Sequence, residues 1–197
     1  MFNIDKYGNF KPKKREENKT QIVLFNSSRE VKEYLTSLTI RYNGRYDKIP
    51  HFVVGEDGNI YNLLPENSVT NIFDNDKTND GKVFICLENF GWLVNKPFSD
   101  KYINWKGDIY SSNVFTKKWR GYNFWGVYNK NQIEKTALLC NMIMDKFNID
   151  KNFTGHNTKI EGVDQFEGVV SRSNYTEIFT DINPSFDFKL FFKKIKN

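Results

Sequence analysis

His51-Phe52-Val53-Val54-Gly55-Glu56-Asp57-Gly58-Asn59-Ile60-Tyr61 is the segment of this chain that decides its fold. Two runs rich in β-branched, aliphatic and aromatic residues flank Glu56-Asp57-Gly58. An Asp-Gly pair between two such runs is a good short-range signal for a β-hairpin. We therefore predict a hairpin over residues 51–64, and the elements around it extend the sheet.

Two further strands are predicted on either side of the hairpin. Gln21–Asn26 is a short apolar run that stops at Ser27-Ser28, and residues 82–88 form a longer apolar run after a polar loop over residues 66–81. Short apolar runs bounded by polar turn residues are typical of buried strands. We expect residues 82–88 to be central in the sheet.

Helical patterns follow the first strand and occupy the last third of the chain. Ser27 and Glu30 have the spacing of a capping box, so a helix is predicted to begin there. A second helix is predicted from Asn131 as the cap, and a third from Pro184-Ser185. Their inward-facing residues are Val31, Tyr34, Leu35 and Leu38; Ile133, Ala137, Cys140, Met144 and Phe147; and Phe188, Phe191, Phe192 and Ile195.

The order of these elements predicts an α/β fold, a central mixed β-sheet flanked by helices. Residues 1–20 are polar and are expected to form an extended arm, and residues 21–197 a single domain. Residues 90–130 contain all 4 Trp residues and interrupt the pattern as an insertion. This insertion has two interpretations: a β-rich unit whose aromatic rings fill its own core, or an aromatic and basic platform for a ligand. Residues 158–178 are expected to be a loop.

Composition excludes several classes of protein. The 197 residues are 39% hydrophobic, too apolar for a disordered chain. No apolar run has the length of a membrane span, and no signal-peptide core precedes residue 21, so a host cytoplasm or a phage virion is the expected location. The net charge of +5 is modest and gathers at the two ends. Nucleic-acid binding is not expected, because no phosphate-binding or base-stacking motif accompanies those ends.

Histidine and cysteine are scarce, which limits any metal site. The chain has 2 His and 2 Cys: His51, His156, Cys86 and Cys140. Cys140 lies on an apolar helical stripe and is expected in the core. His156 and Asp181 lie in consecutive polar segments, and Zn²⁺ accepts both imidazole and carboxylate ligands. Two cysteines are too few for a disulfide scaffold, so a reducing compartment is expected.

Other residues are candidates for catalysis or substrate binding. Glu88 ends a predicted strand, where a general base can be presented. His51 opens the hairpin, so its ring faces either the core or a cleft. Trp92 stands at the start of the aromatic insertion, and its ring could stack on a ligand.

Five segments resemble the motifs of one enzyme family. His51 to Tyr61 is similar to an HF-I--DG-IY hairpin, and residues 153–157 are similar to a --GH-D segment. Residues 180–188 resemble TDPGPxFDW, and weaker likenesses cover residues 22–28 and 84–89. These motifs together resemble the type 2 N-acetylmuramoyl-L-alanine amidases, a family that includes phage amidase-lysozymes and peptidoglycan recognition proteins.

The resemblance implies a zinc site, and this sequence departs from it. The family holds one zinc through two His and an Asp or Cys, with an open position for water. By motif, the second His falls on His156 and the Asp on Asp181, whereas the first His falls on Phe25. The family's strand Glu falls on Cys86, and its Lys falls on Phe179.

The sequence therefore leaves two functions open. In one, the chain is a zinc-dependent peptidoglycan amidase, with His156, Asp181 and a third ligand such as Cys86 on the metal and Glu88 as base. Asn26 or His51 is an alternative source of the missing ligand. In the other, the chain is a non-catalytic module, a pseudoenzyme that binds a peptidoglycan fragment or a protein partner in a phage particle. His51 and Trp92 are the expected substrate contacts in both.

Overall fold

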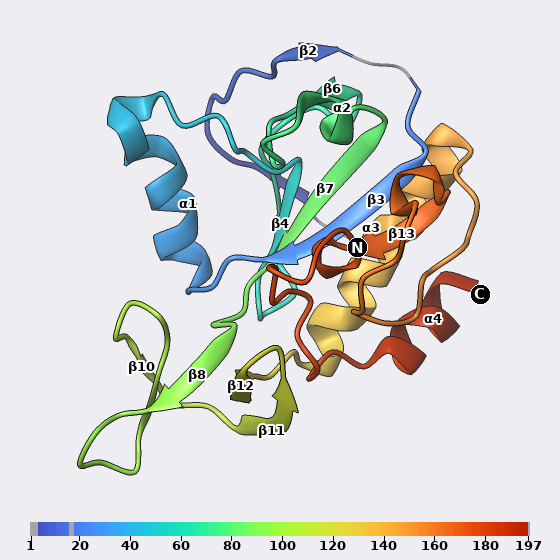
Figure 1. Cartoon of the computed structure of the whole chain (residues 1–197). Helices are drawn as coiled ribbons and strands as arrows, with labels where there is room; N and C mark the ends of the chain where they lie inside the picture. Colours follow the sequence, from blue (N-terminus) through green and yellow to red (C-terminus); the bar gives the residue numbers. More distant parts are fainter. Residues whose placement is uncertain (1–3, 16–17, 197) are drawn as a thin grey trace.

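A six-stranded mixed sheet forms the centre of the computed structural model, which describes residues 4–15 and 18–196 (Figure 1). The strand order is β1-β5-β4-β7-β3-β13. A small two-stranded ladder joins β2 to β6. The strands of these two sheets are β1 Ile4–Lys6, β2 Lys14–Arg15, β3 Gln21–Asn26, β4 Phe52–Val54, β5 Ile60–Asn62, β6 Ser68–Val69, β7 Lys82–Leu87 and β13 Gly168–Ser171.

The middle of the sheet is parallel and buried on both faces. β3 pairs in parallel with β7 and β13, and β4 pairs in parallel with β7. Every residue of β3 and β7 is buried. Strands covered on both faces need continuous apolar sequence rather than an alternating pattern, which explains the runs QIVLFN and KVFICL. Both predicted strands are confirmed.

The predicted hairpin is also confirmed. β4 and β5 are antiparallel, with Phe52 opposite Asn62 and Val54 opposite Ile60. Gly58 stands in the connecting turn with φ of 83°, a conformation that a side chain disfavours. β4 continues the sheet to the parallel strand β7, so this hairpin joins the antiparallel edge to the parallel centre.

Helices cover both faces of the central sheet (Figure 1). α3 (Lys130–Phe147) and α4 (Phe188–Lys196) pack on one face, and α1 (Val31–Ile40) packs on the other. A short helix, α2 (Asp76–Asn79), precedes β7, and 3-10 turns span Arg41–Gly44, Val163–Gln165 and Arg172–Asn174. Within the described part of the chain, no helix combines the length and the apolar character that crossing a bilayer requires.

The insertion forms a second sheet that extends from the end of β7 (Figure 1). Its strand order is β10-β9-β8-β12-β11. Trp125 is fully buried, and Trp92 stacks on Tyr122 with ring centroids 4.4 Å apart. The β-rich interpretation is therefore correct for most of its rings. The strands are β8 Trp92–Asn95, β9 Tyr102–Ile103, β10 Ile109–Tyr110, β11 Val114–Trp119 and β12 Tyr122–Gly126.

Both predicted helix caps are wrong. α1 begins at Val31 after Glu30, and the Ser27 hydroxyl donates to the Arg29 carbonyl rather than capping the helix. The Val31 N–H is instead satisfied by Glu88, far away in sequence. α3 is capped by Asn129, whose side-chain oxygen accepts from the Gln132 N–H at 2.9 Å. Local spacing does not show which of several polar residues meets the free N–H groups.

Three further expectations differ from the structure: the start of α4, the loop before it and the N-terminal arm. α4 begins at Phe188, later than Pro184, and Phe192 is 37% exposed rather than part of the buried stripe. The expected loop over residues 158–178 contains β13, a four-residue strand that lengthens the parallel sheet. In the predicted arm, β1 pairs with β5 and β2 with β6, whereas residues 1–3 and 16–17 lie outside the described residues.

His51 joins three strands from inside the core. Its Nδ1 accepts from the Phe84 N–H at 3.0 Å, and its Nε2 lies 2.9 Å from the Ser68 carbonyl. A ring that accepts at Nδ1 and donates at Nε2 is the neutral tautomer. Burial, reinforced by the charge of Lys19, lowers its pKa from 6.5 to about 3.

We predict that the buried neutral ring of His51 makes stability depend on pH. Between about pH 6.5 and pH 3 the unfolded chain binds a proton at residue 51 that the folded chain does not. The free energy of unfolding therefore falls as the pH is lowered, by up to about 1.4 kcal/mol per pH unit. Urea unfolding at pH 7, 6 and 5 measures this slope.

His156→Gln is the matched control, because it removes the other histidine of the chain from an exposed loop. We expect the slope to persist in that variant and to be lost in His51→Gln. An unchanged slope in His51→Gln contradicts the assignment.

Candidate functional site

The carboxyl ends of β3, β7 and β13 meet at one edge of the sheet, because these strands are parallel neighbours. Phe25 in β3 lies opposite Cys86 in β7. Arg172 directly follows β13, and Asp181 lies nine residues further along the chain. Polar side chains at such an edge are well placed to form a site.

Arg172 and Asp181 form an ion pair at this edge. The Nη2 of Arg172 lies 2.7 Å from Oδ2 of Asp181, and its Nε donates to Oδ1 at 3.2 Å. The Asn26 N–H donates to Oδ2 at 3.0 Å. Asp181 is 2% exposed, so its carboxylate is enclosed by partners from the protein itself.

Two aromatic rings hold the guanidinium of Arg172. Its Cζ lies 5.0 Å from the ring centroid of Phe25 and 4.4 Å from that of Phe179. Both distances are in the range of cation–π contacts. These are the two positions where the family resemblance implies a zinc-binding His and a Lys. The structure therefore brings three of the motif positions, residues 25, 179 and 181, together around one arginine.

The candidate metal ligands do not form a group. Asp181 is paired with Arg172, and His156 is exposed, with Nδ1 2.8 Å from the Thr158 hydroxyl. Within residues 4–15 and 18–196, no cluster of three or more His, Cys, Asp or Glu side chains is arranged to hold a metal. Phe25 offers no donor atom. The side chains at this edge thus do not fit a zinc ion, since a protein zinc site needs at least three ligands.

Cys86, the candidate third ligand, lies in the core. Its side chain is fully buried next to Tyr34, and burial raises the pKa of its thiol. Cys140 is buried on the opposite face of the sheet, as expected, and both cysteines are free.

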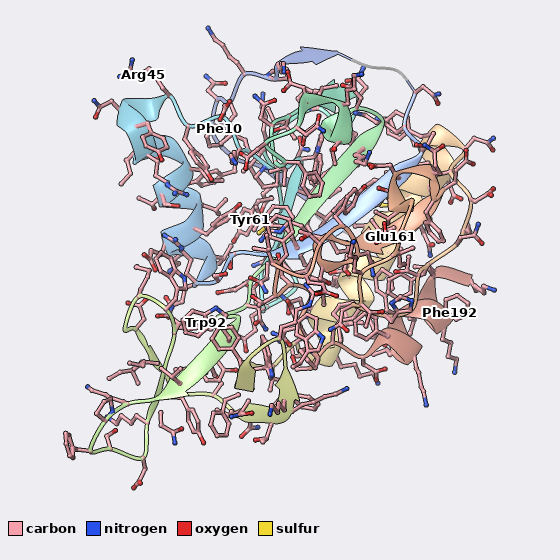
Figure 2. All side chains as sticks on the ribbon, in the orientation of Figure 1. Phe10, Arg45, Tyr61, Trp92, Glu161 and Phe192 are labelled. Carbon is pink, nitrogen blue, oxygen red and sulfur yellow. The ribbon has the colours of Figure 1, made fainter. Side chains whose placement is uncertain are left out.

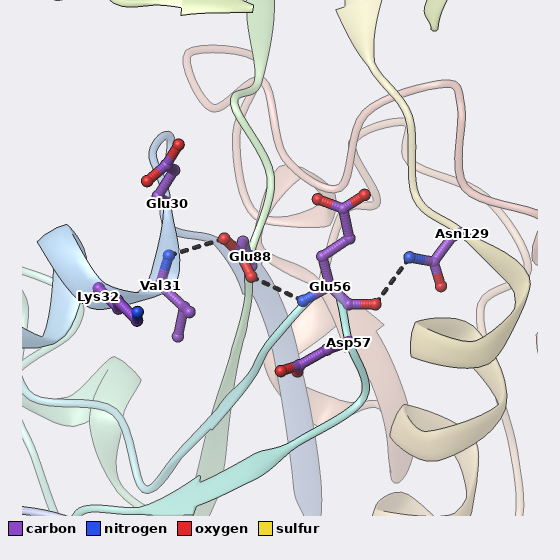
Figure 3. Close-up of a pocket in the computed structure, with 7 residues that line it drawn as sticks. All are labelled: Glu30, Val31, Lys32, Glu56, Asp57, Glu88 and Asn129. Carbon is purple, nitrogen blue, oxygen red and sulfur yellow. Dashed lines mark hydrogen bonds between the residues drawn. The ribbon is translucent and has the colours of Figure 1, made fainter. Parts of the chain in front are cut away.

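Glu88 lies at a different cavity, of about 550 Å³, between α1, the β4–β5 turn and the start of α3 (Figure 3). Oε1 accepts from the Val31 N–H at 2.8 Å, and Oε2 accepts from the Glu56 N–H at 2.7 Å. Burial raises the pKa of Glu88, and these two hydrogen bonds oppose that rise. Both oxygens thus tie backbone segments together. The structure gives this carboxylate an anchoring position.

His51 and Trp92, the expected substrate contacts, lie apart from the cavity at Glu88 and from the Arg172–Asp181 pair. None of the His51 ring is exposed, so it has no surface to offer a ligand. Trp92 lies half-buried on β8 (Figure 2). Its ring stacks on that of Tyr122. Neither residue lines the cavity at Glu88 or the second cavity, beside Arg172, that is described next.

A second cavity, of about 200 Å³, lies beside the Arg172–Asp181 pair. Four basic side chains line it, and we call it the cationic cavity: Arg29, Arg41, Lys48 and Arg172. Sequence reasoning missed these residues because they come from four separate segments. One signal was available for Arg29, which follows the predicted strand Gln21–Asn26, and none for Arg172, because β13 was not predicted.

The insertion contacts this region in two places. Trp105 lines the cationic cavity, and its Nε1 donates to the Ser28 carbonyl at 3.2 Å. Arg120, in the β11–β12 turn, donates to the carbonyls of Thr176 at 2.8 Å and Ser173 at 3.0 Å, and also to that of Phe179. The insertion thus supports the segment between Arg172 and Asp181.

The chain is similar to one family model and to several solved structures. The family model described as N-acetylmuramoyl-L-alanine amidase matches residues 16–167, so the match ends before Arg172 and Asp181. No curated protein has significant sequence similarity to the chain.

Several solved structures share the fold. The N-acetylmuramoyl-L-alanine amidase LysC from Clostridium intestinale URNW aligns with a TM-score of 0.58 at 14% identity, over 98% of this chain and 97% of that one. The endolysin amidase LysCS from the same organism gives 0.59 at 14% identity, over 100% and 97%. AmpDh3 from Pseudomonas aeruginosa, in complex with anhydromuramic pentapeptide, gives 0.53 at 13% identity, over 95% and 63%.

We predict that Glu88→Gln destabilises the fold by about 1–2 kcal/mol, because an amide group can accept only one of the two backbone N–H bonds with its oxygen. Glu56→Gln is the matched control in the same cavity, and its exposed side chain should change stability by less than about 0.5 kcal/mol. Urea unfolding measures both. Equal stability of the two variants contradicts the anchoring position of Glu88.

Proposed function

The chain belongs to the N-acetylmuramoyl-L-alanine amidase family, and on that premise we propose that it recognises bacterial peptidoglycan as a binding module. In this proposal it holds a muropeptide without cleaving the lactyl-amide bond by the zinc-dependent route. The alternative from the sequence, a zinc amidase with Glu88 as base, is tested below by the same experiment.

The observation that carries the proposal is the Arg172–Asp181 pair. A zinc ion bound by Asp181 must displace a guanidinium that already neutralises this carboxylate, and it must do so beside Phe25, which has no donor atom. With His156 exposed and Cys86 in the core, the remaining motif residues supply too few ligands.

The similar structures support peptidoglycan as the partner. AmpDh3 was solved with an anhydromuramic pentapeptide, and LysCS is an endolysin. The shared fold suggests that this chain acts at the cell wall on a fragment of that kind. A phage origin and a protein partner in a phage particle remain predictions from the sequence.

We predict that the purified protein binds isolated sacculi in a pull-down and contains far less than one zinc per chain. Incubation with sacculi should release no free alanine amino groups, because no described group of side chains is arranged to hold the metal. Metal analysis and amino-group labelling measure the two quantities. One zinc per chain that is lost in His156→Ala, together with amine release, supports the amidase instead.

A double variant tests why zinc is disfavoured. Phe25→His with Arg172→Ala supplies a ligand and removes the guanidinium, so we expect its zinc affinity to exceed that of the wild type by at least about tenfold. Phe25→His alone is the control, because the cation then remains beside Asp181. Equal zinc affinity of the double variant and of Phe25→His alone, measured by chelator competition, contradicts the role given to Arg172.

A further inference from the structure

We propose that the cationic cavity binds a carboxylate group of its ligand. The inference deepens the proposed function and rests on it, since the peptide of a muropeptide carries carboxylates and no phosphate. In this arrangement Arg172 provides a fixed positive charge at the position where the family resemblance implies a metal.

The charges around the cavity favour an anion. Its lining contains four basic side chains and no acidic one. Three of the four have a carboxylate partner outside the lining: Arg172 with Asp181, Lys48 with Asp74, and Arg29 with Glu33 at 3.6 Å. Positive charge therefore exceeds negative charge at the cavity.

Two arginines retain unused hydrogen-bonding capacity. Arg41 has no carboxylate within ion-pair distance among the residues that the structure describes. The Nε of Arg29 is buried without a hydrogen-bond partner in the described structure. The protein encloses this Nε, so the donors open to a ligand at the cavity are those of the exposed Arg41, and a carboxylate oxygen is a suitable acceptor for them.

Aromatic rings hold the guanidinium groups in place. The Cζ of Arg41 lies 4.2 Å from the ring centroid of Tyr46, and that of Arg29 lies 5.3 Å from the ring of Trp105. A guanidinium that packs its face on a ring keeps its N–H edge available for a planar partner. The fork of N–H groups then matches the two oxygens of a carboxylate.

The size of the cavity limits what enters it. A volume of about 200 Å³ admits one small group rather than a whole muropeptide, so most of the ligand must lie outside. Trp105 is 51% exposed at the wall that the insertion provides, and its ring can contact the part that remains outside. In this proposal, Trp105 is the residue of the insertion that serves as an aromatic platform for the ligand.

A titration with a matched pair of small probes tests the cavity directly. N-acetyl-D-alanine carries a carboxylate, and N-acetyl-D-alaninamide has the same shape without the charge. The indole N–H signal of Trp105 in ¹⁵N-labelled protein, assigned with Trp105→Phe, should shift with the acid and not with the amide. Arg41→Gln should weaken acid binding by about tenfold, the range expected for one charge-assisted hydrogen bond.

Control variants separate a specific effect from loss of net charge or of folding. Lys118→Gln makes the same change of charge on an exposed residue of β11 and should bind the acid as the wild type does. Arg172→Lys keeps the charge beside Asp181 but loses the fork, and it should also weaken binding. Equal binding of acid and amide, or full binding by Arg41→Gln, overturns the inference.

The same variants on sacculi distinguish this inference from the proposed function. If wild type and Arg41→Gln bind sacculi equally, the carboxylate site is wrong and peptidoglycan recognition stands. If the wild type ignores sacculi but binds the acid, the proposed function is wrong and the cavity stands. Sacculi stripped of phosphate polymers by hydrofluoric acid should bind fully, and loss of binding there overturns the carboxylate in favour of a phosphodiester.

Discussion

The pair between Arg172 and Asp181 joins three parts of the chain at one edge of the sheet. It links the end of β13 to the segment before α4, and the Asn26 N–H adds the end of β3. Removing one partner of such a buried pair leaves an unpaired charge, at a cost of about 3–5 kcal/mol. The protein therefore carries its own cation where the family resemblance implies a metal, and the chemistry open to this edge follows from that charge.

The aromatic insertion serves its own fold and the site together. Trp125 and the stacked pair Trp92–Tyr122 fill a core inside the second sheet. Trp105 and Arg120 contact the site instead. Trp105 lines the cationic cavity, and Arg120 donates hydrogen bonds to the carbonyls of Ser173, Thr176 and Phe179. The β-rich interpretation thus holds for the rings packed within the insertion, and the platform interpretation stays a prediction for Trp105.

The parts of the fold that were predictable rest on short-range patterns. The Asp57-Gly58 turn and the buried runs of β3 and β7 each carry their signal within about ten residues. The caps of α1 and α3 were missed because several polar residues compete for them, and Glu88 reaches Val31 from 57 positions away. β13 was missed because four residues in a polar region carry too little pattern.

Sequence alone determined the fold family and the loss of two motif residues, because Phe25 and Phe179 are identities that no packing can alter. It also determined that metal ligands are scarce. Only the tertiary structure decided what stands in their place. Arg172 belongs to no motif, and it reaches Asp181, Phe25 and Phe179 because β13 ends beside β3. Contacts between distant segments depend on strand order and register, which local sequence does not specify.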